Sequence, residues 1–279
     1  MIQGTLYLVA TPIGNLEDIS PRALRILKDA DLIACEDTRH TARLLARYEI
    51  GTPRESYHKF NEEKRTYRLL QRLKEDAQIA LVSDSGTPLV SDPGYEIVAA
   101  CRREGIRVIP VPGPSAAIAA LTASGLPADS FFFAGFLPAR STERKRRLKG
   151  IAAVPATLIF YEAPHRLLAS LSDMVETLGS RQASIARELT KIHEEFLAGT
   201  LPELLNLFQA REKIRGEFVI VVERGEASPE PVAYPDSIKR HLEAEIQKTG
   251  LARNEALKSV ARQRGITRRQ AYRMILDEE

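Results

Sequence analysis

The sequence predicts an α/β protein with two sheet-containing domains and a small helical module at its C-terminal end. Three observations carry this prediction. Short apolar runs alternate with amphipathic segments as far as residue 222, which is typical of strands and helices in alternation. Residues 225–235 hold three prolines, two acids and small residues, a composition that indicates a linker. Beyond the linker, the apolar residues follow helical spacing alone.

The predicted first domain covers residues 1–118. Leu6–Ala10 is a short run of β-forming residues, and Ser20-Pro21 begins a helix because serine caps a helix and proline is favoured at its first position. The unbroken apolar run Ile79–Val82 indicates a strand covered on both faces, as in a parallel sheet. The other expected elements are strands at Leu32–Cys35 and Arg107–Val111, and helices over residues 66–73, 92–105 and from 115.

The predicted second domain covers residues 119–226. Its expected strands are Phe131–Phe136, Thr157–Tyr161, Ala183–Arg187 and Glu217–Val222, with helices over Leu167–Leu178 and Leu201–Gln209. The last module, residues 236–279, contains two amphipathic helices joined at Gly265-Ile266-Thr267. This spacing fits a helix-turn-helix.

Composition excludes several classes of protein. The 279 residues carry a net charge of +3, and the two cysteines, Cys35 and Cys101, lie in apolar contexts, so we expect no disulfide framework and a reducing compartment. None of the five histidines has a cysteine or histidine at ligand spacing, so no metal site is expected. Apolar runs reach about five residues, whereas a membrane span needs ~20. With no signal-peptide pattern at the N-terminus, the sequence predicts a cytoplasmic protein with no membrane segment.

Four loops that follow predicted strands are rich in Gly, Pro and small polar residues. Glycine allows a backbone to approach a ligand, and proline stiffens the loop. Ligands of doubly wound sheets bind at the carboxyl ends of the strands, so four such loops predict a cleft. The loops are residues 11–15, 83–88, 112–115 and 162–166.

The loops do not fit a dinucleotide or a nucleoside triphosphate. Gly14 is the only glycine of the first turn, so the G-x-G-x-x-G fingerprint is absent, and no loop has the G-x-x-x-x-G-K-[ST] pattern. Few basic residues lie in these loops. An adenosine-like ligand without phosphate therefore suits them, and S-adenosylmethionine is such a ligand.

Charged and polar residues cluster in three places, two of which directly follow predicted strands. Glu36, Asp37 and Arg39 follow the second strand, where acids at a helix N-terminus are an equally good interpretation. His58 and Asn61 lie in a polar and aromatic connection that could also be a solvated loop. The third group, residues 187–195, contains acids and bases that an ion-pair network would explain equally well.

Basic residues are concentrated in two blocks. Arg140–Lys149 has six basic residues and one acid, and Arg253–Arg273 has seven basic residues and one acid. Such runs are usually solvated faces, but two of them, one on a helix-turn-helix pattern, favour a polyanion partner. Phosphate contacts dominate nucleic-acid affinity, so the pattern is typical of an enzyme that docks on RNA.

Several segments of the chain, most of them loops, carry a family resemblance. They are LYLVATPIGNLEDIS, ACEDTRHT, LVSDSGTPLVSDPG, VPGPSA, FYEAPHR, ARELTKIHEE and GEFVIVVE. With these motifs the chain resembles, from about Gly4 to its end, the ribosomal RNA small subunit methyltransferase I family of bacterial 2'-O-ribose methyltransferases, within the tetrapyrrole methylase superfamily. The motifs ATPIGNLEDI and ACEDTRHT together distinguish this family from the tetrapyrrole-modifying members, whose first loop is richer in glycine.

The resemblance implies a class III methyltransferase fold, with S-adenosylmethionine between two α/β domains. It implies methyl transfer to the ribose 2'-hydroxyl of a cytidine in the decoding region of 16S ribosomal RNA, by a homodimer, and the substrate is either free RNA or the assembled 30S subunit. The cofactor-binding residues that it implies are Pro12, Ile13, Gly14, Ser85, Gly86, Thr87, Val90, Ser115, Ala116, Tyr161, Glu188 and Glu217.

Methyl transfer to a hydroxyl needs in-line alignment and a group that accepts the proton or stabilises the alkoxide. Asp37 and His58 are the candidate bases, and Lys191 and Arg39 are the candidate stabilising cations. The residues predicted to contact RNA are Glu36, Arg39, Asn61, Arg144, Arg146, Arg147, Arg268 and Arg269.

Three alternatives remain. A small tetrapyrrole could be the methyl acceptor, although a small molecule needs no basic helical module. A non-catalytic ribosome-assembly protein would use the basic blocks but would not need four ligand-type loops. A DNA-binding regulator would use the helix-turn-helix, which usually reads DNA.

Overall fold

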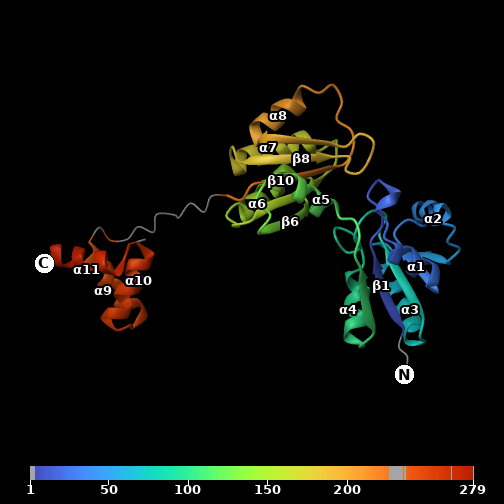
Figure 1. Ribbon diagram of the computed structural model, residues 1–279, viewed down its shortest axis with the longest axis horizontal. Helices are drawn as coiled ribbons and strands as arrows, with labels where there is room; N and C mark the ends of the chain where they lie inside the picture. Colours follow the sequence, from blue (N-terminus) through green and yellow to red (C-terminus); the bar gives the residue numbers. More distant parts are fainter. Residues whose placement is uncertain (1–3, 226–234, 236, 265, 279) are drawn as a thin grey trace. The chain divides into compact units, whose positions relative to one another are not determined.

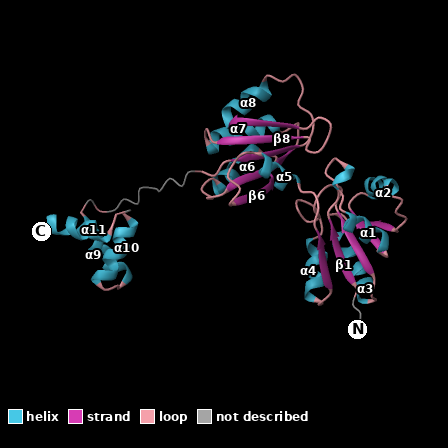
Figure 2. Ribbon diagram, viewed as in Figure 1, coloured by secondary structure: helices cyan, strands magenta, loops and turns pink. Residues whose placement is uncertain are grey.

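The computed structural model describes residues 4–225, 235, 237–264 and 266–278. The chain divides into two compact units, residues 1–225 and residues 226–279 (Figure 1). The larger unit contains two five-stranded sheets with helices packed on them, and the smaller unit contains helices (Figure 2). Most of the linker predicted at residues 225–235 lies outside the described residues.

The first sheet is parallel throughout and has the strand order β3-β2-β4-β1-β5. Its central strands are in register, so that Val9, Val82 and Val111 end β1, β4 and β5 at one level. The loops that follow these strands therefore leave the sheet side by side. The strands are β1 (Thr5–Val9), β2 (Leu32–Cys35), β3 (Arg54–Ser56), β4 (Gln78–Val82) and β5 (Arg107–Val111).

Helices cover both faces of this sheet, as the buried apolar runs predict. Residues of α1 and α2 form one buried cluster with the sheet, and residues of α3 and α4 form the cluster on its other face. The helices are α1 (Pro21–Asp29), α2 (Thr38–Arg47), α3 (Glu62–Lys74) and α4 (Tyr95–Arg103), and a short 3-10 turn, η1, covers Leu16–Asp18.

Local chemistry sets the ends of these helices. The Ser20 side chain accepts a hydrogen bond from the Ala23 N–H, which confirms the predicted cap of α1. The prediction that a helix begins at Asp92-Pro93 is wrong, because those residues stay in the preceding turn and Gly94 is the N-cap of α4. Helix α2 and strand β3 were not predicted as elements.

The second sheet is mixed and has the strand order β6-β7-β10-β8-β9. Strand β10 runs antiparallel to both of its neighbours. Helices α6, α7 and α8 share one buried cluster with the sheet, and α5 packs on the other face. The elements are α5 (Ala116–Ala123), β6 (Phe131–Phe136), α6 (Ser141–Ile151), β7 (Thr157–Glu162), α7 (Leu167–Leu178), β8 (Gln182–Arg187), β9 (Glu195–Thr200), α8 (Leu201–Gln209) and β10 (Phe218–Val222).

The smaller unit contains α9 (Ile238–Thr249), α10 (Arg253–Gln263) and α11 (Arg268–Asp277). Apolar residues of all three helices share one core. Thr267 and Gln270 form a capping box at the start of α11, which explains why a new helix begins there. The sequence predicted the last two of these helices, and α9 precedes them. No helix among the described residues is long and apolar enough to cross a membrane.

Candidate active site

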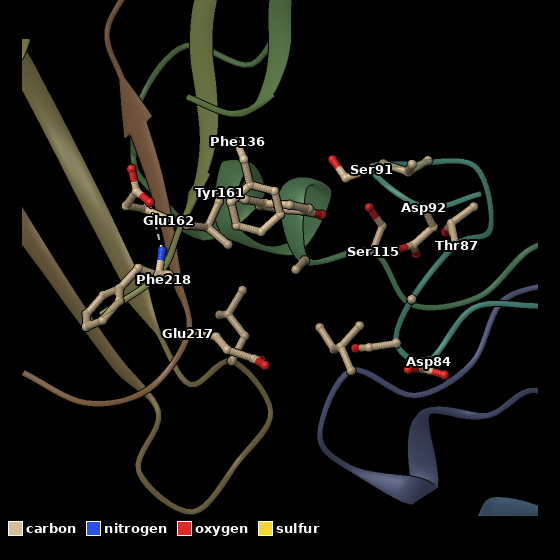
Figure 3. Close-up of a pocket in the computed structure, with 18 of the residues that line it drawn as sticks. Asp84, Thr87, Ser91, Asp92, Ser115, Phe136, Tyr161, Glu162, Glu217 and Phe218 are labelled. Atoms are coloured by element: carbon tan, nitrogen blue, oxygen red, sulfur yellow. Dashed lines mark hydrogen bonds between the residues drawn. The ribbon is translucent and has the colours of Figure 1, made fainter. Parts of the chain in front are cut away.

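A cavity of about 590 Å³ lies where loops of the two sheets meet (Figure 3). Pockets of 300–1,000 Å³ are the usual size for small-molecule and cofactor sites. Its lining residues come from loops after β1, β4, β5 and β7, from the ends of β6 and β7, from the first residue of α5, from the turn after β8, and from the start of β10 with the residue before it. They are Ile13, Asp84, Ser85, Gly86, Thr87, Val90, Ser91, Asp92, Ser115, Ala116, Phe136, Tyr161, Glu162, Ala163, Pro164, His165, Leu189, Glu217, Phe218 and Val219.

The loops after β1 and β4 are joined to each other by hydrogen bonds. The Thr11 N–H donates to the Gly86 carbonyl at 2.9 Å, and the Gly86 N–H donates to the Thr11 carbonyl at 3.0 Å. Gly86 has φ +83°, and a Cβ there would lie 3.3 Å from Cγ2 of Ile13. The Thr87 hydroxyl donates to the Pro114 carbonyl at 3.1 Å, which ties in the loop after β5. The wall of the cavity is therefore a fixed backbone surface.

Four acidic residues gather beside this wall. Asp84 and Asp92 line the cavity, and the Asp37 N–H donates to Oδ1 of Asp84 at 3.0 Å, which brings the loop after β2 against them. Burial and the neighbouring charges of Glu36 and Asp84 raise the pKa of Asp92 to about 6. Burial and Asp84 also raise the pKa of Glu36. A proton can therefore be bound and released here near neutral pH.

The loop after β7 is held from beneath by a buried carboxylate. Glu162 is 2% exposed and accepts hydrogen bonds from the Ala163 N–H, at 2.9 Å, and from the Ser170 hydroxyl. Arg166 pairs with the same carboxylate at 3.3 Å and donates to the Leu137 carbonyl. These contacts fix the turn that presents residues 163–165 to the cavity.

The wall of the cavity that faces the loop after β4 is aromatic. The rings of Phe133 and Phe136 pack edge-on against Tyr161, with centroids 4.9 and 5.6 Å away. The Tyr161 hydroxyl accepts a hydrogen bond from the Ala117 N–H at 3.2 Å, which joins β7 to the start of α5. Figure 3 shows Tyr161 and Phe136 across the cavity from Thr87, Ser91 and Asp92.

Most residues predicted to bind the cofactor line this one cavity. Three of the predicted residues do not line it, although each lies next to a lining residue: Pro12 and Gly14 flank Ile13, and Glu188 precedes Leu189. The predicted residues that line the cavity are Ile13, Ser85, Gly86, Thr87, Val90, Ser115, Ala116, Tyr161 and Glu217.

The residues predicted to act in catalysis do not line the cavity. Asp37 caps α2, and its hydrogen bonds with Arg39 lower the pKa of Asp37 to about 2, which makes it a weak base. The His58 ring contacts the Asn61 amide at 3.2 Å. Lys191 Nζ lies 2.9 Å from Glu188 Oε1 and 3.0 Å from Glu217 Oε2. Burial would lower the pKa of Lys191, but these two carboxylates outweigh it and raise that pKa.

The residues predicted to contact RNA fall into exposed and buried sets. Arg39 is exposed beside Asp37, and Asn61 donates to the Ser56 carbonyl at 3.3 Å. Glu36 lies beside the carboxyl groups of the cavity wall. The side chains of Arg146, Arg147, Arg268 and Arg269 are exposed on α6 and α11.

Arg144 corrects the prediction. Its side chain is buried, with Nε 2.6 Å from Asp173 Oδ2, and Nη1 donates to the carbonyls of Pro138 and Ala139. It is therefore not on the surface where RNA would contact it. The prediction counted the basic residues of 140–149 as one block. It did not consider that Arg144 lies on the inner face of α6 with Leu148 and Ile151.

Sequence reasoning missed several lining residues. Asp84 lies in a loop that the sequence singled out, and a carboxylate among small residues was the signal for it. Phe136 and Leu189 gave no such signal, because only the packing of one sheet against loops of the other brings them to the cavity.

Comparison with known proteins identifies the family. The model of the family described as Tetrapyrrole (Corrin/Porphyrin) Methylases matches residues 5–205. The chain belongs to the tetrapyrrole methylases. This methyltransferase is 51% identical over 280 residues to Ribosomal RNA small subunit methyltransferase I of Halalkalibacterium halodurans, covering 99% of this chain and 96% of the relative. It is 47% identical to the protein of that name from Synechocystis, covering 99% of each. These relatives confirm the family that the motifs predicted.

Solved structures show the same fold. Uroporphyrin-III-C-methyltransferase from Thermus thermophilus has a TM-score of 0.57 at 24% identity, covering 80% of this chain and 95% of that one. The methyltransferase CobJ has a TM-score of 0.60 at 20% identity, with the same coverage of both chains. The two-sheet fold of this methyltransferase is thus shared with enzymes from which its sequence has diverged widely.

Proposed function

We propose that this methyltransferase transfers the methyl group of S-adenosylmethionine to the ribose 2'-hydroxyl of a cytidine in the decoding region of 16S ribosomal RNA. The observation that carries the proposal is its similarity, at 51% identity over 99% of the chain, to a relative named Ribosomal RNA small subunit methyltransferase I. Ribosomal RNA as substrate, acted on in the 30S subunit, agrees with a cytoplasmic protein.

The residues of the cavity fit S-adenosylmethionine. Ile13, Val90 and Leu189 offer an apolar slot, while Ser85 and Thr87 offer polar groups beside exposed backbone. A Cβ at Gly86 would approach Ile13, so the absence of a side chain there leaves room for a ligand against the backbone. One of the similar solved structures, a uroporphyrin-III C-methyltransferase 23% identical to this chain, is described as complexed with S-adenyl homocysteine. When bound, S-adenosylmethionine supplies a methyl group already activated on a sulfonium.

The remaining catalytic work is to orient the ribose hydroxyl and to accept its proton. Asp92 is better suited to accept that proton than Asp37, because Asp92 lines the cavity and its pKa of about 6 lets it act near neutral pH. The fixed loops after β1, β4 and β5 would hold the two reactants in line, which is the larger contribution to a transfer between preorganised groups.

Two exposed basic surfaces would bind the RNA. On α6, Arg146 and Arg147 project outward, and the Arg147 guanidinium lies over the Phe132 ring at 5.7 Å. On α11, Arg268 and Arg269 open the helix. Both surfaces supply phosphate contacts, which position RNA without reading its sequence. The family resemblance also favours a homodimer.

The test is methyl transfer from labelled S-adenosylmethionine to 30S subunits from cells that lack the endogenous enzyme, followed by nuclease digestion. Label in 2'-O-methylcytidine is the expected result. Label on a base would refute the ribose assignment while keeping ribosomal RNA as the substrate. No label, together with tight cofactor binding, would favour a tetrapyrrole-type small molecule. No cofactor binding by calorimetry would favour a non-catalytic ribosome-assembly protein.

A further inference from the structure

The turn after β8 touches loops of both sheets. Residues 188–191 lie between the loop after β1, which belongs to the first sheet, and the start of β10, which belongs to the second. The Asn15 N–H donates to the Thr190 hydroxyl at 3.0 Å, a contact between residues 175 positions apart in the sequence. The turn also supplies Leu189 to the cavity wall.

The backbone of this turn is strained. Glu188 has φ +51° and Thr190 has φ +65°. A β-branched residue with positive φ is an outlier, and such a strained conformation persists only where surrounding contacts hold it. The contacts that hold Thr190 are its hydrogen bond with Asn15 and the bond from its own N–H to Glu194 at 2.6 Å.

The fit between the two loops is close. A Cβ on Gly14 would lie 2.6 Å from Lys191 Cγ, 2.8 Å from Thr190 Oγ1 and 3.0 Å from the Leu189 carbonyl oxygen. Because one of these atoms is backbone, a side chain at Gly14 could not be accommodated by a rotamer change alone. Glycine at this position therefore allows the loop after β1 to reach the turn.

Lys191 secures the other side of the turn. Its ammonium bridges Glu188 and Glu217, and the Glu217 N–H donates to Glu188 Oε1 at 2.9 Å. Glu217 also lines the cavity, so one small network connects the turn, the cavity and β10. The charge of Lys191 is thus engaged by two carboxylates.

We propose that Thr190 is a positioning residue, whose hydrogen bond with Asn15 holds the two sheet-containing halves of the larger unit together across the cavity. We call this contact the clasp, and Lys191 supports it through its ion pairs. Both halves line the cavity, so their separation sets the spacing between groups on its two walls. The proposal rests on the proposed function for its activity readout. Its distance readout stands without any RNA.

The decisive variants are Thr190→Val, which removes the hydroxyl and keeps the branched shape, and Thr190→Ser, which keeps the hydroxyl. Thr177→Val is the matched control, because the Thr177 hydroxyl bonds only within α7, to the Asp173 carbonyl. Gly14→Ala is a second route, since it forces the same two loops apart without altering the turn.

Distances between the halves can be measured with spin labels on Glu63→Cys, on α3, and Asn206→Cys, on α8, both exposed positions. The native cysteines Cys35 and Cys101 are buried and will label poorly. With S-adenosylmethionine present, we expect one narrow distance distribution in the parent and in Thr190→Ser. We expect a broader or longer one in Thr190→Val and Gly14→Ala.

Methyl transfer in a single turnover should fall on the order of 10–100-fold in Thr190→Val and recover in Thr190→Ser, because small misplacements of reacting groups have effects of that size. A residue of merely structural importance would lower stability and leave the distance distribution unchanged. The proposal is overturned if Thr190→Val keeps the parent distribution, or if Thr190→Ser is as perturbed as Thr190→Val. If the parent fails to methylate 30S subunits while the distances behave as expected, the proposed function fails and the clasp stands.

Discussion

Removing Arg144 tests whether the basic segment of α6 contains one structural arginine among surface ones. The Arg144 and Asp173 side chains are 4% and 8% exposed, and Nε lies 2.6 Å from the carboxylate. Arg144→Ala leaves this carboxylate buried without its main partner, and it also frees the carbonyls of Pro138 and Ala139. Breaking one side of a buried ion pair costs about 3–5 kcal/mol.

The free energy of unfolding should therefore fall by about 3–5 kcal/mol in Arg144→Ala. At 2–4 °C per kcal/mol for a unit of this size, Tm should fall by roughly 6–20 °C. Arg146→Ala is the matched control, since that side chain is exposed on the same helix and its removal should change stability by no more than about 0.5 kcal/mol. Urea unfolding followed by circular dichroism gives the first quantity, and a thermal scan gives the second.

Two further results would decide the case. Replacing the pair together, as Arg144→Met with Asp173→Leu, should recover most of the lost stability, because apolar residues of similar volume substitute well for buried pairs. The reasoning is refuted if the free energy of unfolding of Arg144→Ala lies within about 1 kcal/mol of the parent value. It is equally refuted if Arg144→Ala weakens ribosomal RNA binding as much as Arg146→Ala does while remaining fully folded.

Three other predictions concern the cavity and the helical unit. Because Asp92 has a pKa of about 6, methyl transfer should rise as pH increases through about 6, and Asp92→Asn should be slow and lack this limb in a pH–rate profile. The raised pKa also means that ionisation of the Asp92 carboxyl opposes folding. The stability that the protonated form confers is therefore lost as the pH rises from the unfolded pKa of about 3.9 to the folded pKa of about 6. The urea midpoint of Asp92→Asn, compared with that of the parent, should therefore be higher above pH 6 than it is at pH 4. Gly86→Ala should weaken binding of S-adenosylmethionine about tenfold in calorimetry, because φ +83° disfavours a side chain and the new Cβ meets Ile13, whereas Gly105→Ala, with φ +69° and open space, should leave the Kd unchanged; equal Kd values would contradict the fit of the cofactor to the cavity. Replacing Arg268 and Arg269 together by Ala should reduce the salt slope of ribosomal RNA binding by roughly 1–2 and leave cofactor binding intact, and an unchanged slope would remove α11 from the RNA surface.

Regular elements were predictable where the pattern of apolar residues agrees with the residues that cap or end an element. Strands 107–111 and 131–136 and helices 167–178 and 201–209 were predicted with the bounds that the structure has. Gly179 ends one of these helices and Thr200 caps the other, so local chemistry marked the boundaries. Strand β9 was missed, because it is an edge strand with alternating exposure and no continuous apolar run.

The site was predictable as far as it is local. Loops that leave parallel strands at one edge converge, so Ile13, Ser85 and Ser115 could be assigned to one cleft from their positions alone. Thr190 could not be found that way, because its significance lies in a contact with Asn15 and in a backbone conformation that threonine rarely adopts. Asp92 was read as the start of a helix, and burial beside other acids gives it its chemistry.

The common level at which β1, β4 and β5 end has a consequence for how this chain can vary in length. Val9 pairs with both Val82 and Val111, so the first strand sets the height of three cavity loops at once. Inserting or deleting one residue within β1 would turn its side chains to the opposite faces and shift its loop against the other two. Length changes should instead be confined to loops at the opposite, amino-terminal ends of the strands, such as the turn at Glu75-Asp76 that joins α3 to β4. Among natural relatives, the segment from Thr5 to Gly14 should therefore be free of insertions and deletions.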